Sequence, residues 1–196
     1  NIEPDTYNII LNGVVRGKGE VRVGKELAIN PGGITETIDG IPTKEPAFGL
    51  PAIWIDPNDR DNAKAIGYTV VDGATAVATH LNKILKDNSA ELLSHNETQQ
   101  ILDRFKEKSP KLIEDLIPNK LSVSDITKVF KNLLKDSISL KDMRTILETL
   151  SDASAKTKDP DELTSIVRPK LGRLIVQELI DVNDTLPVMT LDPKLE

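Results

Sequence analysis

The sequence predicts an α+β chain of several small subdomains, with a small β-rich amino-terminal part followed by a compact helical subdomain. Ten of the 11 glycines lie in the first 73 residues, and glycine marks the tight turns that join strands. Beyond residue 73 the sequence instead repeats helix-start signals, each followed by apolar residues at helical spacing. A length of 196 residues is enough for several modest cores, so one large core is not required.

The β-rich part is expected to contain short strands separated by turns. Apolar and alternating runs predict strands at residues 7–11, 20–23, 52–55 and 68–71. The glycine-rich run at residues 13–19 is expected to form the turn of a hairpin between the first two strands. It does not match a phosphate-binding loop, because it lacks the Gly-Lys-Ser/Thr ending and precedes a strand instead of a helix.

The rest of the chain is expected to be helical. An amphipathic helix is predicted from Ala74, because apolar side chains recur at helical spacing between Val77 and Leu85. Further helix starts are predicted at Asn96, Ser109-Pro110, Ser122, Ser139 and Asp159-Pro160. They imply four or five short helices between about residues 90 and 180, and Pro169 is expected to kink or end the last of them. Residues 186–191 are expected to be a strand that opens a further unit.

Composition argues against several classes of function. Lys and Arg total 25 against 31 Asp and Glu, which gives a net charge of -6 and opposes binding of nucleic acid. The absence of cysteine excludes disulfides, thiolate catalysis and cysteine metal sites. The two histidines, His80 and His95, match no metal-binding spacing and are expected at the surface or its boundary. No cofactor or metal is expected.

An enzyme is not expected either. The carboxylates around Asp56 lack the glycine and terminal glutamate of a calcium loop, and no nucleophile has an evident base beside it. A hydrolase that works by acid–base catalysis remains an alternative, and it would require two carboxylates that converge in a cleft.

One segment, residues 40–55, stands out in composition. It holds three prolines and two of the six aromatic residues, Phe48 and Trp54. Because proline fixes the backbone and lacks an N–H donor, the segment is expected to be a rigid loop that holds Phe48 at or near the surface. The alternative is that Phe48 and Trp54 both fill the core of a small β-rich subdomain.

At these residues the sequence resembles a known family. The matching runs lie in order at residues 30–32, 44–50, 52–55, 67–72, 78–81, 109–116, 131–134, 142–148, 159–161, 171–173 and 191–193. They are similar to the cytoplasmic domain of the FHIPEP family, the large export-gate proteins of the bacterial flagellar type III secretion apparatus. The resemblance covers nearly all 196 residues.

The resemblance implies part of the cytoplasmic domain of a bacterial inner-membrane protein, without its membrane segments. No stretch approaches the roughly 20 apolar residues that span a bilayer. Four soluble subdomains are implied, and the chain is expected to be cut at both ends. The implied divisions are 1–23 for the end of the first subdomain, 24–72 for an inserted second, 73–92 for the return to the first, 93–172 for the helical third and 173–196 for the start of the fourth.

The resemblance also implies a function, namely docking of export chaperones with their late cargo on a nonameric ring that contacts other export-apparatus components. The family's chaperone site is a hydrophobic dimple between the first and second subdomains. By motif it would comprise Glu45, Phe48 and Thr79, with Glu45 as a charge at the rim, Phe48 as the apolar contact and Thr79 as a hydroxyl contact. Flagellar members often have Asp at the position of Glu45. The alternative function is a ring-assembly or structural module of a related injectisome export gate, using residues 93–172.

Overall fold

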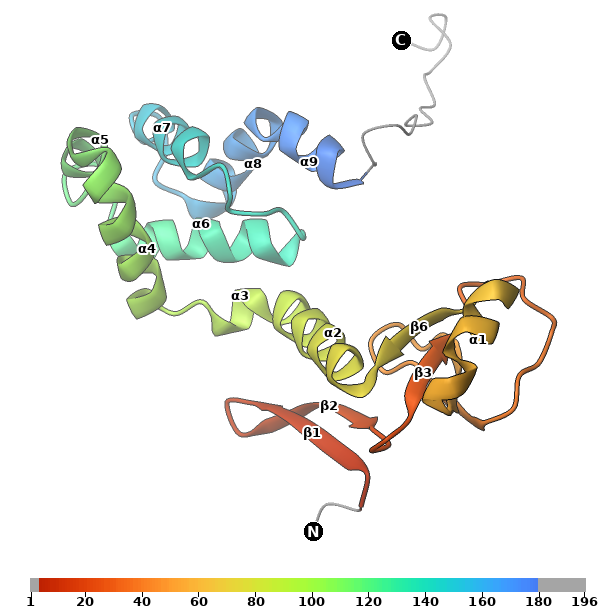
Figure 1. Ribbon diagram of the computed structural model, residues 1–196. Helices are drawn as coiled ribbons and strands as arrows, with labels where there is room; N and C mark the ends of the chain where they lie inside the picture. Colours follow the sequence, from red (N-terminus) through yellow and green to blue (C-terminus); the bar gives the residue numbers. More distant parts are fainter. Residues whose placement is uncertain (1–3, 180–196) are drawn as a thin grey trace, which may run out of the picture. The chain divides into compact units, whose positions relative to one another are not determined.

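Residues 4–179 of the chain are described by the computed structural model shown in Figure 1. They confirm the α+β class and form two units, one that ends at Asn88 and one that begins at Ser89. The finer five-part division stays a prediction, and the predicted strand at 186–191 lies outside the described residues. No helix within residues 4–179 has the length and apolar character needed to cross a bilayer.

The first unit begins with a hairpin of β1 (Thr6–Leu11) and β2 (Val14–Glu20), which pair antiparallel. The strands are joined by Asn12 and Gly13, whose φ angles are 50° and 81°. A turn with two positive φ angles suits the twist of a hairpin, and Asn-Gly is its strongest sequence signal. The prediction of a turn at 13–19 and a strand at 20–23 is therefore wrong, because the two-residue turn lets β2 start at once.

Two glycines lie inside β2 because the strand approaches its neighbours closely. A Cβ atom on Gly17 would lie 2.9 Å from the imidazole of His80, on helix α2 (Gly73–Asp87), and one on Gly19 would overlap the phenol ring of Tyr7. The Tyr7 hydroxyl is hydrogen-bonded to His80 Nδ1 at 2.9 Å. His80 is thus buried, and only His95 is exposed as predicted.

A four-stranded antiparallel sheet forms the rest of this unit. Its strands β3 (Glu26–Ile29), β4 (Ile41–Lys44), β5 (Pro51–Ile55) and β6 (Thr69–Asp72) lie in the order β4-β5-β3-β6. Neighbouring strand residues point to opposite faces. Ala28 accordingly packs with Ala63 of α1 (Arg60–Ile66), which follows the short 3₁₀ turn Pro57–Asp59, while Leu27 packs with Ala76 of α2. Strand β4 and helix α1 were not predicted.

The second unit is helical and holds more helices than the predicted four or five. Within the described residues they are α3 (Ser89–Leu92), α4 (His95–Lys108), α5 (Pro110–Leu116), α6 (Val123–Lys135), α7 (Met143–Ala153), α8 (Pro160–Lys170) and α9 (Gly172–Leu179). The core centres on α6, which buries Val129, Phe130 and Leu133. Asp142 caps α7 in place of the predicted Ser139, and α8 ends directly after Pro169.

Helix α6 begins with a reciprocal cap. The Ser122 hydroxyl oxygen accepts a hydrogen bond from the Asp125 N–H at 3.1 Å, and the Asp125 carboxylate accepts one from the Ser122 N–H at 3.1 Å. The Ser122 hydroxyl also donates to this carboxylate at 2.6 Å, and that bond is the main reason why the pKa of Asp125 lies below its usual range. The cap therefore satisfies donors that the first turn of a helix leaves unpaired.

Ser122→Ala is expected to lower the free energy of unfolding of the helical unit by about 1 kcal/mol, because a helix start loses its cap. The matched control is Ser124→Ala, since Ser124 is exposed in the same first turn and makes no side-chain hydrogen bond within the described part of the chain. Urea denaturation followed by far-ultraviolet circular dichroism measures the stability of both variants.

The effect of the cap should depend on pH. Because the folded-state pKa of Asp125 is lowered, the carboxylate contributes to stability at neutral pH, and this contribution is lost as the pH falls below the ordinary value of about 3.9. Below that pH the free energy of unfolding of Ser122→Ala should approach that of the unaltered chain. Equal losses of stability in Ser122→Ala and Ser124→Ala would contradict the capping role.

The junction of Tyr7 and His80 gives a second prediction. Burial, and then the nearby charge of Glu45, raise the pKa of Tyr7. Its ionisation should therefore occur above the ordinary value of about 10, and the stability of the first unit should fall with rising pH because the unfolded chain ionises first. Tyr7→Phe should therefore remove the high-pH step from the tyrosine absorbance titration. Trp54 is the only tryptophan and lies in this unit, so its fluorescence should also report a loss of about 1 kcal/mol in Tyr7→Phe, from the lost hydrogen bond. A high-pH step that persists in Tyr7→Phe would contradict the assignment.

Candidate functional site

The loop between β4 and β5 is a tight turn closed by its own backbone. The Glu45 N–H donates to the Leu50 carbonyl at 2.8 Å, and the Gly49 N–H donates to the Glu45 carbonyl at 2.9 Å. Gly49 has a φ of 71°, a left-handed conformation that glycine adopts without strain. Pro46 lacks an N–H and fixes its own φ, so the start of the turn is rigid. The short strands on either side thus hold this loop in a defined shape.

The turn places the two aromatic residues of its segment in opposite environments. Phe48 is 63% exposed, whereas Trp54 on β5 is 1% exposed and packs with Leu27 and Ala76. The expectation of a surface position is confirmed for Phe48, and the expectation of a core position is confirmed for Trp54 alone. A large apolar side chain on a rigid turn is a natural contact for an apolar partner.

Glu45 lies beneath the turn and not at its rim. The residue is 3% exposed, and its carboxylate oxygens accept hydrogen bonds from the Ala47 N–H at 2.9 Å and the Phe48 N–H at 2.6 Å. The expectation of a charge at the rim is therefore wrong. The physical reason is that the backbone of the turn leaves these two amides unpaired, and the carboxylate is the acceptor that satisfies them.

The buried charge of this loop acts on Tyr7 of the hairpin. The charge of Glu45 contributes, after burial, to the raised pKa of Tyr7, and Tyr7 is hydrogen-bonded to His80. The rings of Tyr7 and His80 meet edge to face, with centroids 5.7 Å apart. Tyr7 of β1 thus interacts with the loop through the charge of Glu45 and with α2 through a hydrogen bond to His80.

Thr79 precedes His80 on α2 and has the opposite orientation. His80 is buried, whereas Thr79 is exposed and its hydroxyl donates to the Thr75 carbonyl at 2.9 Å. The Thr79 oxygen still has acceptor capacity toward solvent. Of the three predicted site residues, Glu45 and Phe48 are joined by a hydrogen bond, while Thr79 makes no hydrogen bond to either.

The sequence reasoning missed Tyr7 and His80 as parts of this region. Their signal was the pair of glycines at alternating positions in β2, Gly17 and Gly19, which leave room for the two rings. Alternating glycines in a strand are typical of a face that another group approaches closely.

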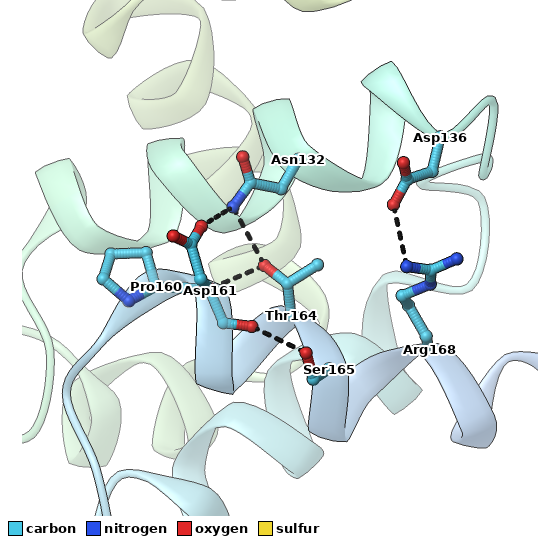
Figure 2. A network of polar contacts seen from close by, with 7 residues as sticks. All are labelled: Asn132, Asp136, Pro160, Asp161, Thr164, Ser165 and Arg168. Carbon is cyan, nitrogen blue, oxygen red and sulfur yellow. Dashed lines mark hydrogen bonds and ion pairs between the residues drawn. The ribbon is translucent and has the colours of Figure 1, made fainter.

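A second candidate is a pocket of about 230 Å³ in the helical unit, between α6 and α8. Figure 2 shows its polar groups. Asn132 donates to the Asp161 carboxylate at 2.8 Å and to the Thr164 hydroxyl oxygen at 3.3 Å. Arg168 forms an ion pair with Asp136 at 3.2 Å.

These contacts bear on the hydrolase alternative. The carboxylates of Asp136 and Asp161 line one pocket, but each is directed to its own partner and not to the other (Figure 2). The network fastens α8 to α6 and offers no acid–base pair. Within residues 4–177 no group of three or more His, Asp and Glu side chains is arranged to hold a metal ion.

Comparisons with known proteins cover the chain from end to end. A model of the FHIPEP family matches residues 1–196. The flagellar biosynthesis protein FlhA of Proteus mirabilis is 44% identical over 195 residues, a match that covers 100% of this chain and 28% of that relative. FlhA of Bacillus subtilis is 40% identical over 195 residues, with 100% and 29% covered. This chain therefore spans less than a third of the length of these relatives.

Solved structures share the fold. The CdsV protein of Chlamydia pneumoniae matches with a TM-score of 0.77 at 25% identity, over 90% of this chain and 51% of that one. The nonameric SctV-C of EPEC matches with a TM-score of 0.65 at 23% identity, over 88% and 52%. With a family model that matches every residue and relatives that align along the whole length, the chain belongs to the FHIPEP family.

Proposed function

We propose that this chain is a cytoplasmic docking platform of the flagellar type III protein export gate, which binds export chaperones together with their cargo. The single observation that carries the proposal is Phe48, which is 63% exposed on a turn that is hydrogen-bonded from beneath. Membership of the FHIPEP family and the similarity to flagellar FlhA proteins support the flagellar branch.

The energetics of Phe48 favour a contact role. Complete burial of a phenylalanine side chain contributes about 1.5–3 kcal/mol, and a few such anchors account for most of the affinity of an interface. Because the turn is already fixed in the free chain, little conformational entropy is lost when a partner covers it. Thr79 adds a hydroxyl on a separate element, suited to a directional hydrogen bond.

The wider setting is part of the same proposal. The chain acts as part of the cytoplasmic domain of a bacterial inner-membrane protein, alongside other components of the export apparatus. In the intact protein these domains assemble into a nonameric ring, as the related SctV-C does. No catalytic step is proposed.

The alternative is a ring-assembly or structural module of a related injectisome export gate, which uses the helical residues 93–172. Two measurements separate the possibilities. Static light scattering over a range of concentrations detects self-association, and titration with a chaperone–cargo complex detects docking. Self-association without docking would favour the alternative.

Phe48→Ala is expected to weaken binding of a flagellar export chaperone–cargo complex about 30-fold, or about 2 kcal/mol, because the buried apolar area is lost. Isothermal titration calorimetry with the 196-residue chain measures the affinity. The matched control is Val23→Ala, which shortens an apolar side chain that is 93% exposed outside the loop and should leave the affinity unchanged. Equal affinities for Phe48→Ala and the unaltered chain would rule out this site while leaving the family membership intact.

A further inference from the structure

We propose that Glu45 is a positioning residue of the docking loop, residues 45–50 between β4 and β5. Its carboxylate holds the turn that presents Phe48 and does not itself contact the partner. The inference rests on the proposed function of Phe48 and assigns Glu45 a role beneath the docking surface in place of a charge at its rim.

The geometry uses both oxygens of the carboxylate within the loop. One accepts from the Ala47 N–H at 2.9 Å and the other from the Phe48 N–H at 2.6 Å. The residue is 3% exposed, so a basic side chain of a partner has no access to it. A buried carboxylate is tolerated when it is hydrogen-bonded in this way.

The backbone alone does not complete this turn. Its own hydrogen bonds involve the N–H groups of Glu45 and Gly49. The amides of Ala47 and Phe48 lie between these two and find their acceptor in the Glu45 side chain. Hydrogen bonds to an ionised acceptor are stronger than neutral ones, so the carboxylate fixes the peptide planes on either side of Ala47. Those planes set the direction in which Phe48 leaves the turn.

This arrangement determines the chemistry of the partner at the loop. The charge of Glu45 faces inward, where it contributes to the raised pKa of Tyr7. The face presented to a partner is the exposed Phe48 ring. The partner therefore supplies an apolar side chain here, and no basic side chain that pairs with Glu45.

The experiment compares Glu45→Ala with Glu45→Asp, and uses Glu36→Ala as the control for loss of one negative charge at an exposed position. Amide hydrogen exchange, followed by NMR in the 196-residue chain, is the first readout. In Glu45→Ala the Ala47 and Phe48 amides should exchange about tenfold faster or more, while amides of β3 keep their rates. Glu45→Asp should restore slow exchange, because aspartate readily accepts from amides two and three residues ahead.

Affinity for a flagellar export chaperone–cargo complex is the second readout. Glu45→Ala should weaken binding about tenfold, by the same factor at low and high salt, since no ion pair with the partner is lost. Glu45→Asp should bind like the unaltered chain. Unchanged amide exchange in Glu45→Ala would overturn the inference, and so would a loss of affinity that disappears at high salt. Failure of Glu45→Asp to restore slow exchange would also overturn it, because its carboxylate is the proposed cause.

The two proposals fail separately. If Phe48→Ala binds as tightly as the unaltered chain, the docking site is wrong, and the exchange rates still decide whether Glu45 holds the turn. If the exchange rates do not respond to Glu45→Ala, the positioning role is wrong, and the affinity of Phe48→Ala still decides the docking site.

Discussion

The docking loop depends on one buried carboxylate. Glu45 accepts two backbone hydrogen bonds from the turn that it begins, and so converts a six-residue connection between short strands into a rigid support for Phe48. Without that acceptor, the Ala47 and Phe48 amides would have to hydrogen-bond to water, and the direction of the exposed Phe48 ring would not be fixed. An exposed aromatic residue is useful for recognition when its backbone does not have to be ordered on binding.

The loop is also linked to the elements around it. The inward charge of Glu45 acts on Tyr7, Tyr7 is bonded to His80, and Gly17 and Gly19 leave space for both rings. The junction of Tyr7 and His80 therefore joins the hairpin to α2 by a hydrogen bond and is linked to the docking loop by the charge of Glu45. Thr79 is next to His80 on α2. The packing that buries the His80 ring therefore also fixes where the Thr79 hydroxyl lies on the surface.

The sequence predicted much of this fold because its signals are local. Capping residues such as Ser122, and proline at the start of α8, mark helix starts through their own hydrogen bonds and backbone angles. It misplaced β2 because residues 13–19, with three glycines, read as a turn, although Asn12 and Gly13 alone make the turn. Gly17 and Gly19 lie in the strand and leave room for the rings of His80 and Tyr7. The inward orientation of Glu45 and the burial of His80 likewise depend on tertiary partners. A motif names such residues without showing which way they face.

The central claim is that the Glu45 carboxylate is bonded to the Phe48 amide in the free chain. The most direct test is the NMR scalar coupling across that hydrogen bond, between the Phe48 amide nitrogen and the Glu45 side-chain carboxyl carbon. A resolved coupling, with a Phe48 amide proton shifted downfield, is the predicted result. A Phe48 amide without this coupling, and with the chemical shift of a solvent-exposed loop, would contradict the account.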